Sequence, residues 1–449
     1  MSPETQEAAG GGADSTGPVS PYQVLVFVLC FLIVLVDGFD TQAVAFAAPL
    51  LRHELGGGHN ALGLLFSAGL LGGLVGGLVF GPVGDRIGRK PILVAALAIV
   101  GAGTLATATA HGAPALAALR FFTGLGLGGA IPGVIALAAE YAPPGRRKLI
   151  VSMVFSGFPL GAVVGSLVSA WVLPEFGWRA LFVIGGAAPA ILLPLCWILL
   201  PESLAHLRAW RGSDQAAARI VARLGPQATL ALGDEGRDHR APRNAIADLF
   251  SEGRAAGTAL LWLICFVSLL ATYCTISWLP TLVREAGLPL STAVLAAGSI
   301  NIGSVLGNIV LSRLGDRISP FGPIAAAFLL GGLCVGLIGQ ATGSSGEMLG
   351  VCMAAGAFAV GAQLSITALI AAYYPARLRA TGVGWSFGVG RLGGVVGPMI
   401  AGVLLAADVG FDRLMFVIGA IFIIAAVAVV LLARTQGALA LRPVAEVAR

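Results

Sequence analysis

The sequence predicts an all-α polytopic membrane protein with twelve transmembrane helices in two pseudo-symmetric six-helix halves. Composition is the first observation, because 57% of the 449 residues are hydrophobic and only 11% are charged, whereas soluble domains carry about 25% charged residues. The second is that one long polar segment, 201–256, divides the apolar segments into two groups of six. The apolar segments have the length of roughly 20 residues that crosses a bilayer and cover residues 24–50, 61–83, 91–110, 115–141, 149–172, 179–200, 257–280, 291–312, 322–342, 348–373, 380–405 and 413–434.

The polar segments set the remaining boundaries. Residues 1–21 contain no Lys or Arg and so lack the basic region of a cleaved signal peptide; we expect a disordered tail. The halves are then 22–200 and 257–434, and 435–449 is a second tail. The linker 201–256 mixes Arg with Leu, Ile and Ala, as in AAARIVARLG, which predicts amphipathic helices on the membrane surface.

Basic residues predict the orientation. Of the 27 Lys and Arg residues, only Arg52, Arg179, Arg284 and Arg413 fall in loops on one side, and Arg120 and Arg391 lie inside spans. The rest gather on the side that holds both termini. Because cytoplasmic loops are enriched in Lys and Arg, we expect both termini in the cytoplasm, in a bacterial inner membrane. This topology accounts for the positive charge, so nucleic-acid binding is not expected.

The two halves repeat each other. GDRIGRK begins at Gly84 and GDRIS at Gly315, and LGAVVG at 160–165 is matched by LGGVVG at 392–397. The two matches have nearly the same offset, which indicates duplicated halves. Parallel repeats of this kind place a substrate site near the membrane midplane, between the halves.

Several of these stretches resemble signatures of the major facilitator superfamily. GPVGDRIGRKP (81–91) is similar to its signature between spans two and three, and RFFTGLGLGG (120–129) to its fourth-span signature. Within the superfamily, DGFD (37–40), the stretch from Glu140 to Arg147, and the span-eleven motifs RATGVG and GRLG resemble the aromatic acid:proton symporters. The resemblance covers the whole chain. It implies the superfamily fold, with Asp85 as a helix-capping acid and Arg86 and Arg89 as a cytoplasmic latch.

Arg391 is the candidate anchor for an anionic substrate. It lies eleven residues into its span, roughly 16 Å deep, and Asp37 lies at a similar depth of roughly 20 Å in span one. Guanidinium groups match carboxylates with paired hydrogen bonds. The alternative is a structural ion pair between Arg391 and Asp37, and the two roles could also alternate.

Asp37 and Asp40 are the candidate proton carriers. Residues i and i+3 share a helix face, and two carboxylates so close in a poorly hydrated cavity are not expected to be ionised together. For Asp40 alone, the alternative is a buried partner for Arg120, which we expect to tune the acids.

Other residues are weaker candidates. A mid-span amide needs a polar partner, so Gln363 and Asn308 are candidate substrate contacts. Aromatic walls are expected from Phe39, Phe158 and Trp385, although each is more often a packing residue. Glu140 is expected to latch onto the cluster at 85–89, with a solvated interfacial charge as its alternative.

Together these observations predict a proton-coupled secondary transporter, not an enzyme, that imports a small aromatic carboxylate of the hydroxybenzoate, benzoate or gentisate type. The alternatives are a proton-coupled carrier of a sugar, a non-aromatic organic acid or a drug, and a membrane chemosensor for aromatic acids. No G-x-x-x-x-G-K-[ST] motif is present, so ATP drive has no support. We expect no cofactor besides protons, no metal site, and a monomer in the bilayer.

Overall fold

The computed structural model describes residues 19–55, 58–209 and 245–440. Within these residues the chain is helical and contains no strand. Most of the predicted N-terminal tail, the linker stretch AAARIVARLG and residues 441–449 lie outside the described residues.

The N-terminal half is built from long apolar helices. They are α1 (Pro21–Leu55), α2 (Gly58–Ile87), α3 (Arg89–Thr109), α4 (Ala113–Tyr141), the short 3-10 turn η1 (Pro144–Arg146), α5 (Arg147–Phe155) and α6 (Gly157–Leu199). α6 contains a reversal at Gly177, whose φ of 74° and ψ of 178° are not helical. Glycine adopts this positive φ without steric strain because it has no Cβ.

The C-terminal half repeats this arrangement. Its helices are α11 (Ala255–Glu285), α12 (Leu290–Arg317), α13 (Phe321–Ile338), α14 (Ser345–Ala355), the π-helical turn η2 (Gly356–Val360), α15 (Gly361–Leu364), α16 (Ile366–Tyr373), α17 (Ala376–Ala406) and α18 (Phe411–Ala440). α1 packs on α6 as α11 packs on α17, and α3 packs on α6 as α13 packs on α18. The predicted internal duplication is therefore visible as repeated helix pairing.

Twelve spans are present, as predicted. Eleven continuous stretches of the described chain are long and apolar enough to cross a membrane, and one of them, Arg147–Leu199, has 53 residues. Gly177 divides that stretch into spans five and six. The last helix, α18, continues to Ala440, six residues beyond the predicted boundary at 434; the stretch ARTQGALA contains no proline to end it.

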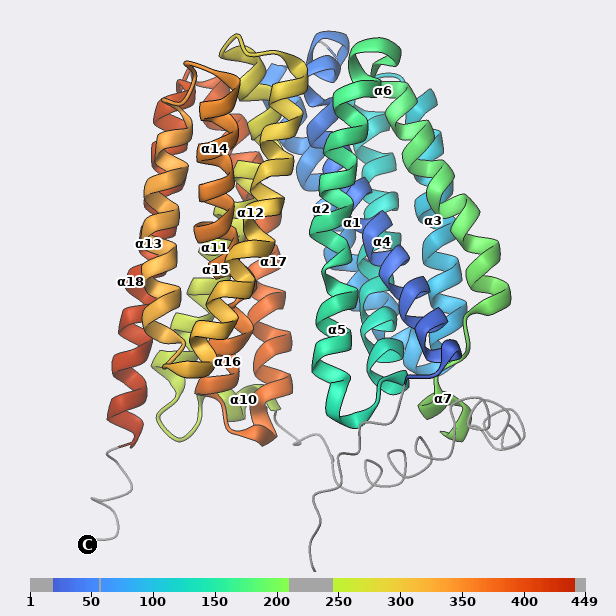
Figure 1. The fold of residues 1–449 in the computed structure, drawn as a ribbon, viewed down its shortest axis with the longest axis vertical. Helices are drawn as coiled ribbons and strands as arrows, with labels where there is room; N and C mark the ends of the chain where they lie inside the picture. Colours follow the sequence, from blue (N-terminus) through green and yellow to red (C-terminus); the bar gives the residue numbers. More distant parts are fainter. Residues whose placement is uncertain (1–18, 56–57, 210–244, 441–449) are drawn as a thin grey trace, which may run out of the picture.

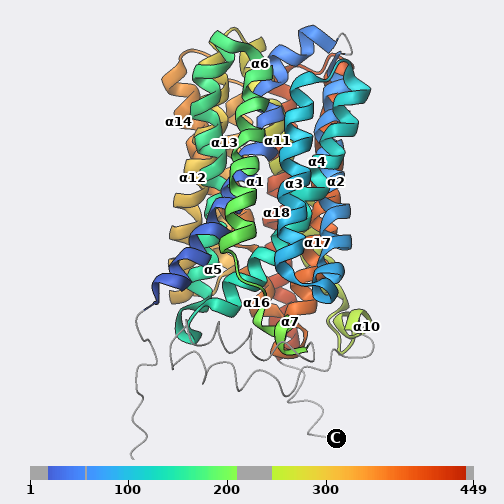
Figure 2. The same cartoon turned by 90° about the vertical axis from the view of Figure 1, so that its right-hand side faces the viewer.

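The helices of both halves run between the same two ends of the molecule (Figures 1 and 2). We call the end where α1 begins and α18 finishes the linker end; the short helices α7 (Leu204–Ala209) and α10 (Ala245–Phe250) also lie there. The opposite end is the distal end. In Figure 1 the two groups of helices lie close together at the distal end, at the top, and further apart at the linker end.

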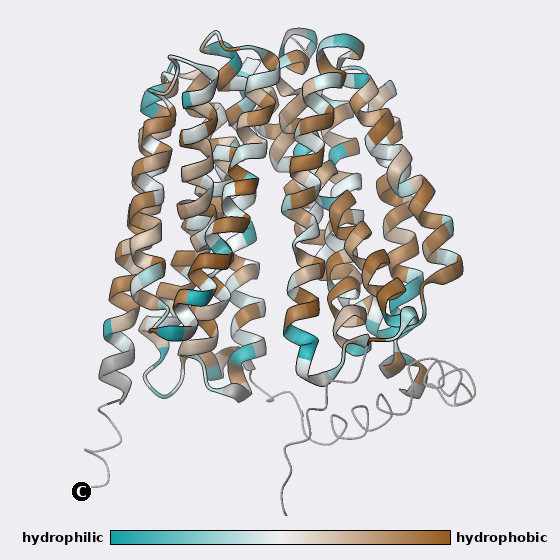
Figure 3. Ribbon diagram, viewed as in Figure 1, coloured by the Kyte–Doolittle hydropathy of each residue, from teal (hydrophilic) through white to brown (hydrophobic). Residues whose placement is uncertain are grey.

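Between these ends the helices consist mainly of hydrophobic residues (Figure 3). Large side chains such as Leu78, Ile191, Ile198 and Phe416 are between 65% and 72% exposed. A soluble monomer rarely exposes so much contiguous apolar surface, so these side chains are placed to contact lipid. The chain is thus a multi-pass membrane protein.

Two close helix contacts position the residues near the midplane. A Cβ on Gly38 of α1 would lie 1.9 Å from the carbonyl oxygen of Phe158 on α6, and one on Gly128 of α4 would lie 1.9 Å from that of Gly73 on α2. Any side chain at either glycine would push the helices apart. The glycines therefore hold α1 against α6 and α2 against α4 around the site described next.

Candidate functional site

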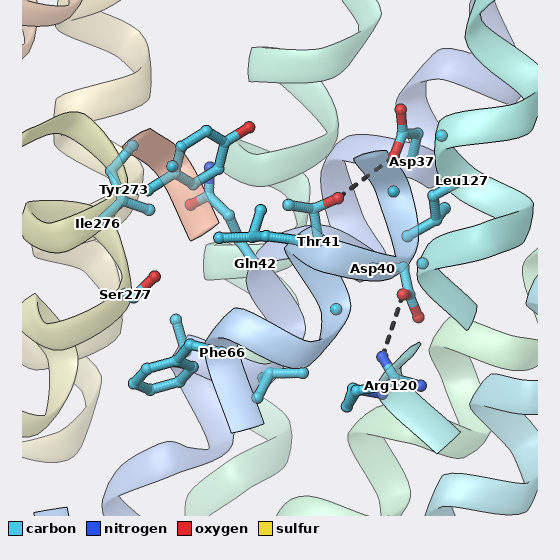
Figure 4. A pocket seen from close by; sticks show the side chains of 18 of the residues that line it. Asp37, Asp40, Thr41, Gln42, Phe66, Arg120, Leu127, Tyr273, Ile276 and Ser277 are labelled. Atoms are coloured by element: carbon cyan, nitrogen blue, oxygen red, sulfur yellow. Dashed lines mark hydrogen bonds and ion pairs between the residues drawn. The ribbon is translucent and has the colours of Figure 1, made fainter. Parts of the chain in front are cut away.

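A cavity of about 140 Å³ lies between the two halves, near the middle of the bundle. Residues of α1, α2, α4 and α6 line one side, and residues of α11 and α17 line the other. Figure 4 shows Asp37, Asp40, Thr41 and Gln42 on α1, with Tyr273, Ile276 and Ser277 extending toward them from α11. Most of the wall is glycine or apolar side chains, so the few charged groups stand in a largely apolar environment.

Asp40 and Arg120 form a buried ion pair inside the N-terminal half. The Arg120 Nη1 atom lies 3.1 Å from Asp40 Oδ2, and the two side chains are only 3% and 1% exposed. Thr104 donates a hydrogen bond of 2.6 Å to the other carboxylate oxygen. The guanidinium also donates to Thr107 (2.8 Å) and Thr123 (3.1 Å). Both charges are thereby neutralised and held in place.

The Arg120 guanidinium also lies over an aromatic ring, with its central carbon 5.1 Å from the ring centre of Phe182 on α6. A cation over a ring face is attracted by the ring quadrupole. Three other helices of the N-terminal half, α1, α3 and α6, thus surround the side chain of Arg120 on α4.

Asp37 has no such counter-charge. Its carboxylate accepts a 3.2 Å hydrogen bond from Thr41, one turn later on α1, and its side chain is 6% exposed. Within the described residues Asp37 is in no ion pair. It therefore faces the cavity with only a hydroxyl group as partner.

Arg391 enters the cavity from α17 in the other half. Its Nη1 donates a long 3.5 Å hydrogen bond to the carbonyl oxygen of Gly73 on α2, and a Cβ at Gly77 would lie only 2.8 Å from the same nitrogen. Among the described residues it forms no ion pair, so the alternative of a structural Arg391–Asp37 pair is not realised here. Most of the guanidinium donors are free to bind a ligand.

The interactions that join the halves cluster toward the distal end. Gln42 of α1 and Asn301 of α12 exchange hydrogen bonds of 3.2 and 3.1 Å, and Ser67 of α2 donates a 2.6 Å bond to the carbonyl oxygen of Val395 on α17. Nearer the distal end, Glu285 pairs with Arg52 and accepts from His59. These contacts close the distal side of the cavity.

Comparison with known proteins identifies the architecture. The family model described as Major Facilitator Superfamily matches residues 30–352 and 261–447. The chain belongs to the major facilitator superfamily. A gallate transporter of Pseudomonas putida is 39% identical, over 90% of each chain. The 4-hydroxybenzoate transporter PcaK of Pseudomonas aeruginosa is 38% identical, over 89% of this chain and 90% of its own.

The fold of solved superfamily structures agrees with this membership. An inward-facing bacterial homologue of the human lysosomal transporter Spinster superposes with a TM-score of 0.72 over 93% of this chain and 98% of its own, at 18% identity. The predicted superfamily resemblance and fold are therefore confirmed. Because this fold and these relatives are transporters, the prediction of a transporter rather than an enzyme is confirmed as well.

Not all predicted substrate contacts of the transporter reach the cavity. Phe158 lines it, as do Asp37, Asp40, Arg120 and Arg391. Phe39 instead points into the N-terminal half, where its ring packs against Gly165 and Gly185 of α6. It adjoins Asp40 in sequence, but successive residues of a helix point in different directions, so Phe39 faces the core.

The predicted contacts of the C-terminal half are also placed elsewhere. Trp385 stacks on Trp262, with ring centres 6.1 Å apart, nearer the linker end of α17. Asn308 accepts a 2.9 Å hydrogen bond from Ser365. Gln363 is 6% exposed on α15, after the π-helical turn. None of the three lines the cavity; in this conformation Trp385 and Asn308 make contacts within their own half.

The predicted gating residues of the transporter form two contacts at the linker end of the N-terminal half. Arg89 pairs with Asp85 within the turn between α2 and α3, and Arg86 is exposed. Glu140 does not join this cluster. It accepts 2.9 Å hydrogen bonds from the hydroxyl of Ser203 and the backbone N–H of Leu204.

Glu202, which follows α6 in the stretch PES (201–203), makes the contact with the turn between α2 and α3 that was expected of Glu140. The Glu202 carboxylate accepts hydrogen bonds from the backbone N–H groups of Arg89 (2.6 Å), Lys90 (3.2 Å) and Ser203 (2.8 Å). It therefore caps the N-terminus of α3, where orphan N–H groups favour a negative charge. The sequence alone did not predict this role for Glu202.

Four other cavity residues were also missed: Gln42, Phe66, Tyr273 and Ser277. Gln42 could have been recognised from the sequence, because it is an amide inside an apolar span and such groups require a polar partner. Which partner it finds depends on the packing of α1 against α12, residues that lie far apart in sequence.

Proposed function

We propose that this transporter imports a small aromatic carboxylate together with protons by alternating access. The observation that carries the proposal is the cavity between the halves. It presents an unpaired guanidinium, Arg391, on one side and an unpaired carboxylate, Asp37, on the other. Charged groups inside a membrane protein are costly and usually mark a transport pathway.

The substrate class follows from size and charge. The cavity has a volume of about 140 Å³, and a cavity of about 150 Å³ in another protein holds one benzene molecule. Arg391 suits a carboxylate because its planar donors match the two oxygens, and Phe66, Phe158 and Tyr273 offer aromatic walls. The gallate and 4-hydroxybenzoate transporters that resemble this chain are named for substrates of this class.

The two aspartates take different roles in the proposal. Asp40 is tied to Arg120, so we assign it a fixed charge that sets the electrostatics of α1. Asp37 forms no ion pair among the described residues, so we assign it the proton, which it takes up when the cavity closes and water leaves. One proton carried with one monoanion moves no net charge, and the pH gradient then drives accumulation.

The orientation rests on the distribution of basic residues. The linker end carries the Lys and Arg clusters at 86–90 and 146–148, so we infer from the positive-inside rule that this end faces the cytoplasm. Because the interactions between the halves cluster at the distal end, we assign this conformation as inward-open. We further propose a monomer in the bacterial cytoplasmic membrane, with both termini inside.

Uptake into proteoliposomes tests this function. Purified transporter is reconstituted, the outside is made acidic, and accumulation of labelled 4-hydroxybenzoate is followed with and without a protonophore. We expect accumulation above equilibrium that the protonophore abolishes. Labelled succinate and xylose, offered in parallel, test the non-aromatic acid and sugar alternatives. If no aromatic carboxylate accumulates under a pH gradient, the proposal is wrong; binding without flux would indicate a sensor.

A further inference from the structure

The polar groups of the cavity fall into two sets. Asp40, Arg120, Asp37 and Gln42 all have protein partners. The hydroxyl groups of Tyr273 and Ser277 on α11 line the cavity as well, and neither has a hydrogen-bond partner among the described residues. A cavity hydroxyl without a protein partner is available to a ligand, and a ligand that excludes water from it must replace the lost hydrogen bond.

The hydroxyl of Ser277 lacks, in the described part of the chain, the backbone hydrogen bond that two other residues of its helix make. A Ser or Thr in a helix commonly bonds the carbonyl oxygen three or four residues earlier, as Thr275 does to Ala271 at 2.8 Å and Ser268 does to Cys265 at 3.3 Å. Ser277 makes no such bond within the described chain. Its hydroxyl is therefore available to the cavity, although its side chain is only 7% exposed.

Tyr273 and Ser277 form one face. They are four residues apart on α11 and so lie on the same side of the helix, about 6 Å apart along its axis. Both extend from α11 toward α1 in Figure 4. The Tyr273 ring also rests against α17, since a Cβ at Gly394 would lie 2.8 Å from its Cδ2 atom.

The position of Gly394 shows where the face formed by Tyr273 and Ser277 lies relative to Arg391. Gly394 follows Arg391 by three residues on α17, about one turn nearer the distal end. Ser277 lies one turn further in the same direction, because α11 also runs from the linker end to the distal end. A ligand whose carboxylate binds Arg391 thus has its ring beside Tyr273 and its far edge near Ser277.

We infer that Tyr273 and Ser277 form a subsite that hydrogen-bonds ring hydroxyl groups, so that the transporter selects hydroxylated aromatic carboxylates over unsubstituted benzoate. This inference rests on the proposed function and assigns specificity within the same site. A neutral hydrogen bond changes affinity by about two- to tenfold. Two such contacts give a hydroxylated ring an advantage of about four- to hundredfold.

Binding measured separately from transport tests the subsite. Isothermal titration of the purified, detergent-solubilised transporter at pH 7 gives the ratio of the Kd for benzoate to the Kd for 4-hydroxybenzoate. We expect a ratio of at least about four for the wild type. Ser277→Ala and Tyr273→Phe should each lower the ratio about two- to tenfold by weakening 4-hydroxybenzoate binding more than benzoate binding.

Two matched variants separate recognition from packing. Ser277→Thr keeps a hydroxyl at the site and should keep the ratio, whereas Ser268→Ala removes a buried hydroxyl of α11 outside the cavity and should not change it. The inference is overturned if both cavity variants keep the wild-type ratio or weaken both ligands equally. Equal wild-type affinity for the two acids also overturns it and leaves the proposed function intact; binding of neither acid overturns the proposed function itself.

Discussion

Gln42 and Asn301 exchange two hydrogen bonds between the halves of the protein, at 3.2 and 3.1 Å. Their side chains are 3% and 4% exposed. Gln42 also lines the cavity, two residues after Asp40 on α1. This amide pair is therefore both the distal boundary of the candidate substrate site and a link that must break if that side is to open.

Loss of the amide pair should shift the transporter toward a distal-open state. Two neutral hydrogen bonds contribute about 1–2 kcal/mol, which corresponds to a five- to thirtyfold change in the ratio of the states. Spin labels at the exposed positions Asn60 and Ala286, with the half-buried Cys334 replaced, report the opening as a longer inter-label distance. Gln42→Ala and Asn301→Ala should each increase the long-distance population.

The double variant sharpens this prediction. If the two amides act through each other, the double variant should resemble either single one, as a double-mutant cycle requires for coupled residues. Ser299→Ala is the control, because Ser299 bonds Leu295 of its own helix. Additive effects, or an unchanged distance distribution, would argue against the amide pair as a link between states.

Asp37→Asn should abolish proton-driven accumulation while leaving substrate exchange intact. The amide keeps the size of the side chain and its contact with Thr41 but cannot carry a proton. Counterflow of labelled against unlabelled 4-hydroxybenzoate measures exchange, and uptake under a pH gradient measures coupling. Asp412→Asn, at an exposed position on α18, is the control for charge loss. Wild-type accumulation by Asp37→Asn would exclude it as the coupling acid.

Arg391→Lys should weaken binding of the carboxylate at least about tenfold. Lys keeps the positive charge but loses the planar pair of donors, and hydrogen bonds to charged groups contribute about 1.5–3 kcal/mol. Titration with 4-hydroxybenzoate measures the affinity. Arg284→Lys serves as the control, since among the described residues the Arg284 side chain bonds the carbonyl oxygen of Leu288, outside the cavity. An unchanged affinity would move the anion site away from Arg391.

The spans and the depth of the charges could be predicted from the sequence, because both depend on position along a helix. The direction of a side chain around its helix could not. Phe39 and Asp40 are adjacent, yet Phe39 packs against α6 while Asp40 lines the cavity. Likewise, Gln42 and Asn301 were each recognisable as mid-span amides, but their pairing required the packing of one half against the other.

The ion pair between Asp40 and Arg120 leads to a prediction on stability. Removing one partner leaves the other charge buried, which costs about 3–5 kcal/mol, whereas replacing both is often nearly neutral. Asp40→Asn and Arg120→Gln should each lower the thermal unfolding midpoint in detergent markedly, and the double variant should recover much of the loss. Glu285→Gln, in the exposed pair with Arg52, should change the midpoint little because surface pairs contribute at most about 1 kcal/mol. A double variant less stable than either single one would show that the two charges are not stabilised by each other.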